Sequence, residues 1–316
     1  LGELSLDGEI RPCTGVLPMV LCAREKGLHA VFVPAANRDE GSIVEGIDVL
    51  PVAHVRQVLD HLQGKTPVEP CYRAFSPEED TLEYLDFADV KGQQNAKRAL
   101  EIAAAGGHNC LMIGPPGTGK SMLAKRLPSI LPEMTFEEQI ETTKIYSIAG
   151  ALPSGTRLIS HRPFRSPHHT VSPQGLTGGG AVPKPGEISL AHNGVLFMDE
   201  FPEFDRRTKE SLRQPLEDGV ITISRAGGSL TYPSNIMVVA AMNPCPCGFL
   251  GHPTKDCTCS QAAVNRYRDK VSGPILDRID LHVEVQSVDY AQLADTSRGE
   301  PSSAIRQRVN RARQMQ

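Results

Sequence analysis

GPPGTGKS, at residues 114–121, is the stretch that decides the fold of this chain. It fits the pattern G-x-x-x-x-G-K-[ST] in full. The apolar run NCLMIG at 109–114 precedes it and favours a short buried strand, whereas KSMLAKRL at 120–127 favours a helix. A strand, a glycine-rich turn and a helix in this order form the start of a phosphate-binding unit. The sequence therefore predicts a nucleotide site at this turn.

The residues of the turn suit the binding of phosphate and magnesium. Gly117 and Gly119 allow backbone N–H groups to converge on phosphate oxygens. We expect Lys120 to reach the β and γ phosphates and the Ser121 hydroxyl to ligate Mg²⁺. A plain glycine-rich loop is the alternative, which the flanking strand and helix disfavour.

Two further apolar runs end in polar residues that suit hydrolysis. GVLFMDE at 194–200 ends in Asp199, which would hold Mg²⁺, and Glu200, which would orient or deprotonate the attacking water. IMVVAAMN at 236–243 ends in Asn243, whose amide could bond the water or the γ-phosphate. The simpler interpretations are a solvated acidic turn and an asparagine that opens a turn. The glycine-rich turn favours the functional interpretation of both.

The order of elements predicts an α/β fold with a parallel sheet covered on both faces. Short continuous apolar runs at 110–113, 195–198, 236–242 and 281–285 alternate with helical stretches. Residues 1–64 indicate a separate α+β domain, with strands around 2–12 and 29–34 and helices at 16–27 and 52–64. We expect residues 65–85, which are rich in proline, to be a linker, and residues 86–316 to be the second domain.

Basic residues outside the turn define further expectations. Arg278 lies in DRID at 277–280, where an intramolecular ion pair is the common case, but in a ring it could reach a neighbour's γ-phosphate. Residues 221–233 alternate around a glycine pair and predict a hairpin with Arg225 near its tip. The glycine-rich loop 175–189 carries Lys184. Such residues are usually solvated, although rings that thread a polyanion place them in the pore.

Composition excludes some classes of protein. The net charge of −4, from 33 basic and 37 acidic residues, gives no global basic field, so any nucleic-acid contact must be local. The longest apolar runs are too short for a bilayer, and the sequence predicts a cytoplasmic protein without membrane contact. The first residue, Leu1, and the arginine-rich final residues lead us to expect a fragment.

Four of the eight cysteines are close together in the sequence: Cys245, Cys247, Cys257 and Cys259. They begin two residues after Asn243. Two Cys-x-Cys pairs with a nine-residue spacer fit a tetrahedral structural Zn²⁺ site. Two disulfides or four free thiols are the alternatives. The adjacent His168 and His169 have no neighbouring metal ligand in the sequence and indicate an ordinary polar loop.

Taken together, these motifs resemble the magnesium-chelatase-like AAA+ ATPases of the bacterial ComM (YifB) type. The resemblance runs from about Asp86 to the last residue and rests on GPPGTGKS, PFRSPHHT, GEISLAHNGVLFMDEFPEF, AAMNPCPCG and SGPILDRIDLHVEV. It implies a homo-hexameric ring with ATP and Mg²⁺, Arg278 acting in trans, and insertions with Lys184 and Arg225 at the pore. The residues implied to serve ATP in cis are Val90, Gln93, Gly114, Pro115, Pro116, Gly117, Thr118, Gly119, Lys120, Ser121, Asp199, Glu200 and Asn243.

The first sixty residues resemble the end of a Lon-protease-like domain. Where the active protease carries its catalytic lysine, TGVLPMV at 14–20 has Leu17 or Pro18, neither of which can act as a base. The resemblance also places a sensor-2 arginine in a helical lid, most of which we expect beyond Gln316.

The resemblance implies an ATP-driven motor on single-stranded or branched DNA, with helicase or branch-migration activity during recombination of incoming DNA in natural transformation. A motor that remodels a protein, such as a magnesium chelatase subunit, is the alternative. The missing lysine disfavours an ATP-dependent protease.

Overall fold

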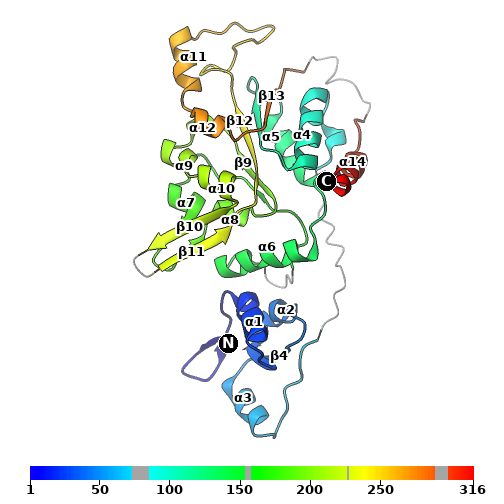
Figure 1. Ribbon diagram of the computed structural model, residues 1–316, viewed down its shortest axis with the longest axis vertical. Helices are drawn as coiled ribbons and strands as arrows, with labels where there is room; N and C mark the ends of the chain where they lie inside the picture. The colour runs from blue at the N-terminus through cyan, green and yellow to red at the C-terminus, as the bar shows by residue number, and fades with distance from the viewer. Residues whose placement is uncertain (73–84, 154–157, 226–227, 289–297) are drawn as a thin grey trace. The chain divides into compact units, whose positions relative to one another are not determined.

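The computed structural model describes residues 1–72, 85–153, 158–225, 228–288 and 298–316 (Figure 1). Its contacts define two compact units. One combines Leu1–Thr81 with Thr135–His161, and the other combines Leu82–Met134 with Arg162–Gln316. The expected linker lies partly at 73–84, outside the described residues. The division at 65–85 stays a prediction, and the structure adds that residues 135–161 group with the N-terminal unit.

The larger unit is built on a five-stranded parallel sheet with the order β13-β5-β12-β9-β6. The strands are β5 (Cys110–Ile113), β6 (Phe164–Arg165), β9 (Val195–Met198), β12 (Met237–Met242) and β13 (Leu281–Glu284). The four apolar runs are therefore confirmed as parallel strands. Of the five strands, only the edge strand β6 was not predicted, because a strand of two residues is too short to show a hydrophobic pattern.

Both faces of this sheet are buried, as the sequence predicted. One face packs against α4 (Gln94–Gly106), α5 (Lys120–Arg126) and α14 (Ser302–Met315), through residues such as Phe197, Val239 and Leu123. Leu196 and Val238, which point to the opposite face by the alternation of strand side chains, are at most 1% exposed. Continuous apolar runs are required for this arrangement.

The strand order determines where the motifs lie. β12 separates β5 from β9, so the residue after β12 lies between the glycine-rich turn after β5 and the acidic pair after β9. In a parallel sheet the carboxyl ends of the strands meet at one edge, where ligands bind. The fold therefore brings residues 114–121, Asp199 and Asn243 to the same edge.

The remaining elements of the larger unit are short helices and two antiparallel ribbons. β10 (Val220–Arg225) pairs with β11 (Gly228–Pro233), which confirms the predicted hairpin, although its turn at 226–227 lies outside the described residues. β7 (Gly178–Gly179) pairs with β8 (Lys184–Pro185) within the glycine-rich segment. The helices are α7 (Pro173–Thr177), α8 (Glu187–Leu190), α9 (Arg206–Glu210), α10 (Arg213–Asp218), α11 (Gln261–Arg268) and α12 (Gly273–Leu276), with 3₁₀ turns at Phe87–Asp89, Leu127–Ser129 and Phe201–Glu203.

The smaller unit has the predicted α+β elements and adds to them. Its elements are β1 (Glu3–Leu4), β2 (Ile10–Arg11), α1 (Val16–Glu25), β3 (Ala30–Pro34), a 3₁₀ turn (Ala35–Asn37), α2 (Arg38–Gly41), β4 (Asp48–Val52), α3 (Val55–Leu62) and α6 (Phe136–Ala149). The predicted strands and helices are confirmed, whereas β4, which pairs parallel with β3, was not predicted.

A buried carboxylate joins α6 to the rest of this unit. Glu40 is 7% exposed; its Oε1 accepts from the Leu17 N–H at 2.9 Å and from the Ser147 hydroxyl, and its Oε2 accepts from Asn37 at 3.1 Å. Buried charge is tolerated only when hydrogen-bonded in this way. The contact explains why 135–161 belongs to this unit, and it places Leu17 at the start of α1 with a fully buried side chain.

Among the helices of the described segments, none combines the length and the apolar character that a membrane span requires.

Candidate active site

The glycine-rich turn is held against the ends of two strands. The Gly114 N–H donates to Met242 O at 3.2 Å, and the Val285 N–H donates to Ile113 O at 2.8 Å. A Cβ at Gly114 would lie 2.1 Å from Val285 O, so only glycine fits there. The loop that follows therefore starts from a fixed point at the carboxyl edge of the sheet.

Lys120 lies at the centre of the polar cluster. Its Nζ donates to the carbonyls of Gly114 at 2.6 Å and Pro115 at 2.9 Å, and to Asn243 Oδ1 at 3.3 Å. Only 9% of the residue is exposed, and this burial lowers the pKa of the ammonium, an effect that the nearby Asp199 charge opposes. The structure therefore brings Lys120 and Asn243 together, as the sequence predicted.

Ser121 and Asp199 form the second half of the cluster. The Ser121 hydroxyl donates to Asp199 Oδ2 at 2.6 Å, and the Glu200 N–H donates to Asp199 Oδ1 at 3.0 Å. A hydroxyl and a carboxylate at this separation supply the hard oxygen ligands that Mg²⁺ prefers, so the donor set fits that ion. Glu200 has a left-handed backbone with φ of 53°. The backbone therefore turns sharply at the end of β9.

A cavity of about 430 Å³ opens beside these residues. Its lining residues are Lys120, Asp199, Glu200, Glu203, Ala241, Met242, Asn243, Pro246, Ala263, Arg266, Tyr267 and Lys270. The last five come from the loop after β12 and from α11 and the residues after it, and the sequence did not identify them. Ala263, Arg266, Tyr267 and Lys270 carry no motif, and only the fold shows that their segment returns to the carboxyl edge.

Tyr267 of α11 and Asn243 at the end of β12 both line the cavity. Burial raises the pKa of Tyr267 to about 12. Lys270 follows α11 and pairs with Glu203 at 3.0 Å. This ion pair holds the segment after α11 beside the cavity.

Val90 and Gln93 lie before α4. Val90 is 4% exposed and its carbonyl accepts from Lys97 Nζ at 2.6 Å. Gln93 Nε2 donates to Thr118 O at 2.9 Å and to Gln286 O at 2.7 Å, which ties the start of α4 to the glycine-rich loop. Their contact with adenine stays a prediction.

His169 is a residue that the sequence assigned to an ordinary polar loop. Its Nδ1 lies 3.3 Å from Glu200 Oε2, and its ring packs on that of His168 with centroids 4.1 Å apart. The segment reaches Glu200 because it follows β6, the edge strand beside β9. The contact of His169 with Glu200 therefore follows from the position of strand β6, which the sequence did not predict, and not from the histidine pair itself.

The predicted basic residues lie apart from the cavity lining. Arg278 pairs with Glu217 of the same chain, which is the common case for an exposed arginine. Lys184 is exposed in β8. Arg225 ends β10 opposite Gly228, and its side chain lies outside the described part of the structure. Their roles stay predictions.

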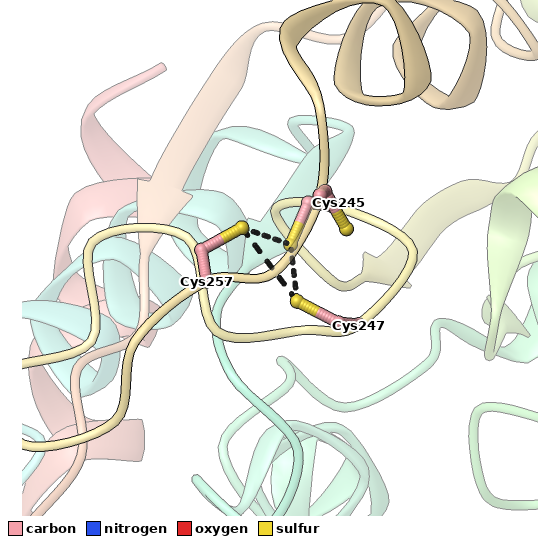
Figure 2. Close-up of side chains that lie close together, drawn as sticks. Cys245, Cys247 and Cys257 are labelled. Carbon is pink, nitrogen blue, oxygen red and sulfur yellow. Dashed lines mark hydrogen bonds between the residues drawn. The ribbon is translucent and has the colours of Figure 1, made fainter.

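The four clustered cysteines come together on the loop after β12. Their Sγ atoms all lie within 4.8 Å of one another. Figure 2 shows the approach of Cys245, Cys247 and Cys257, with Sγ separations of 3.4, 3.7 and 3.6 Å. A disulfide requires about 2.05 Å, so none of them is paired in this way.

Comparison with known proteins shows which family models and which relatives match this chain. The model of "Magnesium chelatase, subunit ChlI" matches residues 86–293, and that of "Subunit ChlI of Mg-chelatase" matches residues 1–37. An uncharacterized protein of Mycobacterium tuberculosis is 46% identical over 99% of this chain. Escherichia coli YifB is 44% identical and Haemophilus influenzae competence protein ComM 43% identical, each over 100% of this chain. The chain spans 62% of the length of each of these relatives.

The contact between the cysteine loop and the glycine-rich turn yields a prediction on stability. A Cβ at Gly248, where φ is +85°, would lie 2.7 Å from Pro116 Cδ, whereas Gly251 has φ of +77° with no atom within 4 Å. Both Gly248→Ala and Gly251→Ala should lose about 1–2 kcal/mol through the left-handed backbone. Gly248→Ala should lose about 1–3 kcal/mol more through the steric clash. Urea denaturation measures both, and equal free energies of unfolding would contradict the packing of this loop on Pro116.

Proposed function

This chain belongs to the family of magnesium chelatase subunit ChlI and is a magnesium-chelatase-like protein of the ComM/YifB type, and from that premise we propose that it is an ATP-hydrolysing AAA+ motor acting on DNA. One observation carries the ATPase part of the proposal. Lys120, Ser121, Asp199 and Asn243 converge at the carboxyl edge of a parallel sheet, beside a cavity of about 430 Å³. Each of these residue types matches a step of phosphoryl transfer.

The chemistry follows from the positions of these side chains. Lys120 would exchange its bonds to the loop carbonyls for phosphate oxygens, because an ammonium gains more from a charged acceptor than from a neutral one. Ser121 and Asp199 would hold Mg²⁺, which neutralises phosphate charge. Glu200 would orient the attacking water and accept its proton, and Asn243 would hold the water or the γ-phosphate.

A ring of subunits would complete the site. Arg278 is bonded to Glu217 of its own chain, which holds its guanidinium at the surface, where a neighbouring subunit can receive it. In a homo-hexamer this arginine would stabilise charge developing on the neighbour's γ-phosphate. Val90 and Gln93 would contact the adenine, since Gln93 already bonds to the loop at Thr118.

The DNA part of the proposal rests on the relatives and on two ribbons. One relative carries the name competence protein ComM, and the resemblance of the motifs to the ComM type leads us to propose DNA as the substrate. Helicase or branch-migration activity in recombination of incoming DNA during natural transformation would suit such a protein. Lys184 in the β7–β8 ribbon and Arg225 in the β10–β11 hairpin would face single-stranded or branched DNA in the pore. We place the protein in the cytoplasm, where this DNA is processed.

A second candidate is a motor that remodels a protein, as a subunit of magnesium chelatase. Both matching family models carry the name of a magnesium chelatase subunit, which favours this candidate. Insertion of Mg²⁺ into a porphyrin by the chain with partner subunits would support this candidate over the DNA motor. The Lon-like interpretation of residues 1–64 implies no proteolysis, because Leu17 is apolar and fully buried.

DNA-stimulated hydrolysis tests the proposal. ATPase activity should rise on addition of forked or single-stranded DNA, and the stimulation should weaken with salt because phosphate contacts release counterions. Lys120→Ala should abolish hydrolysis, whereas Lys184→Ala combined with Arg225→Ala should keep basal hydrolysis and lose the stimulation. Hydrolysis that depends on Lys120 but ignores every DNA substrate at low salt would contradict the DNA motor while leaving the ATPase intact.

The contact between His169 and Glu200 yields a separate prediction. His169→Asn should reduce kcat about tenfold, the usual scale for a group that orients a reacting residue. KM for ATP should not change, since His169 does not line the described cavity. His168→Asn is the matched control, because its Nδ1 bonds Thr170 and leaves Glu200 untouched. Equal kcat values for the two variants would show that His169 does not position Glu200.

A further inference from the structure

The loop between β12 and α11 contains four thiols that the ATPase mechanism does not use. Cys245 and Cys247 lie just after Asn243, and Cys257 and Cys259 lie just before Ser260, which caps α11 through a bond from the Ala263 N–H. In the described segments, these four form the group of three or more His, Cys, Asp or Glu side chains that could together hold a metal ion. One Cys-x-Cys pair therefore lies at the start of the loop and the other at its end.

The separations between the thiols match one coordination geometry. Four sulfur atoms placed 2.3 Å from a central Zn²⁺ lie about 3.8 Å apart at the corners of a tetrahedron. Figure 2 shows Cys245, Cys247 and Cys257 approaching one another. Their Sγ separations are 3.4, 3.7 and 3.6 Å, and the Sγ atoms of all four cysteines lie within 4.8 Å of one another. Paired cysteines would be much closer, and unrelated thiols have no reason to gather.

The same loop touches the nucleotide site at several points. Gly248 passes Pro116 so closely that a Cβ would lie 2.7 Å from Pro116 Cδ, and 3.8 Å from Asn243 Cγ. Pro246 lines the cavity, together with Tyr267 of α11. Anything that fixes the loop therefore also fixes one wall of the cavity.

We propose that Cys245, Cys247, Cys257 and Cys259 hold one structural Zn²⁺ ion, and that this zinc clasp positions α11 against the nucleotide cavity. Four thiolates fill the coordination sphere and leave no open position for catalysis. Only Cys245 of the four cysteines is buried, so the metal would supply a constraint that core packing does not give the other three. The positioning half of the proposal rests on the proposed ATP site, whereas the metal half does not.

Metal analysis of the chain purified without chelator tests the first half. We expect about one zinc per chain in the unmutated protein and in the control Cys22→Ser/Cys71→Ser, which removes two thiols outside the cluster. Cys257→Ser/Cys259→Ser should lose the zinc. Protein reconstituted with Co²⁺ should show the strong visible bands of tetrahedral thiolate coordination. Absence of zinc from the unmutated protein, or iron in its place, would overturn the assignment without the need for any variant.

Nucleotide binding tests the second half. Removal of zinc from the folded protein by a chelator should weaken binding of a non-hydrolysable ATP analogue about tenfold, the scale found when supporting groups around a site are lost. Zinc restored to the protein should recover the affinity. If the purified protein contains zinc in full, but its affinity for the ATP analogue does not change when the zinc is removed, the positioning role is overturned. Zinc bound by a protein that takes up no nucleotide at all would instead contradict the proposed function and leave the metal site standing.

Discussion

The hydrogen bond from Ser121 to Asp199 joins the start of α5, which follows β5, to the residue after β9, and the site depends on it. β12 lies between β5 and β9, so the bond spans the carboxyl edge of the sheet and encloses Asn243. This arrangement requires the strands to be parallel and in register, because a slip of one residue would move each polar side chain to the other face. The burial of both faces of the sheet enforces that register. The packing of the core therefore also determines the positions of the polar residues of the site.

The loop after β12 has a comparable role on the other side of the cavity. It begins at Asn243, carries the four thiols, passes Pro116 and ends at the cap of α11. Tyr267 of α11 and Asn243 both line the cavity, so the two ends of the loop lie beside it. A loop of this length would ordinarily be free to move. Here its contacts make it a wall of the site, and the proposed zinc clasp would account for its order.

The sequence predicted the sheet, the hairpin β10–β11 and the convergence of Lys120, Ser121, Asp199 and Asn243, because continuous apolar runs and a complete phosphate-loop pattern are strong local signals. It did not predict β6, β4 or the contact of His169 with Glu200, since a two-residue edge strand has no period. Nor did it predict that α6 joins the N-terminal unit, which depends on the buried Glu40. These features come from long-range pairing, which no local pattern encodes.

A crystal structure with Mg²⁺ and a non-hydrolysable ATP analogue tests the central claim most directly. The account predicts that Lys120 Nζ leaves the carbonyls of Gly114 and Pro115, 2.6 and 2.9 Å away in the structure described here, and bonds to the β and γ phosphates. Mg²⁺ should lie between Ser121 and Asp199. An analogue bound elsewhere, or one bound while Lys120 keeps both carbonyl bonds, would contradict the account.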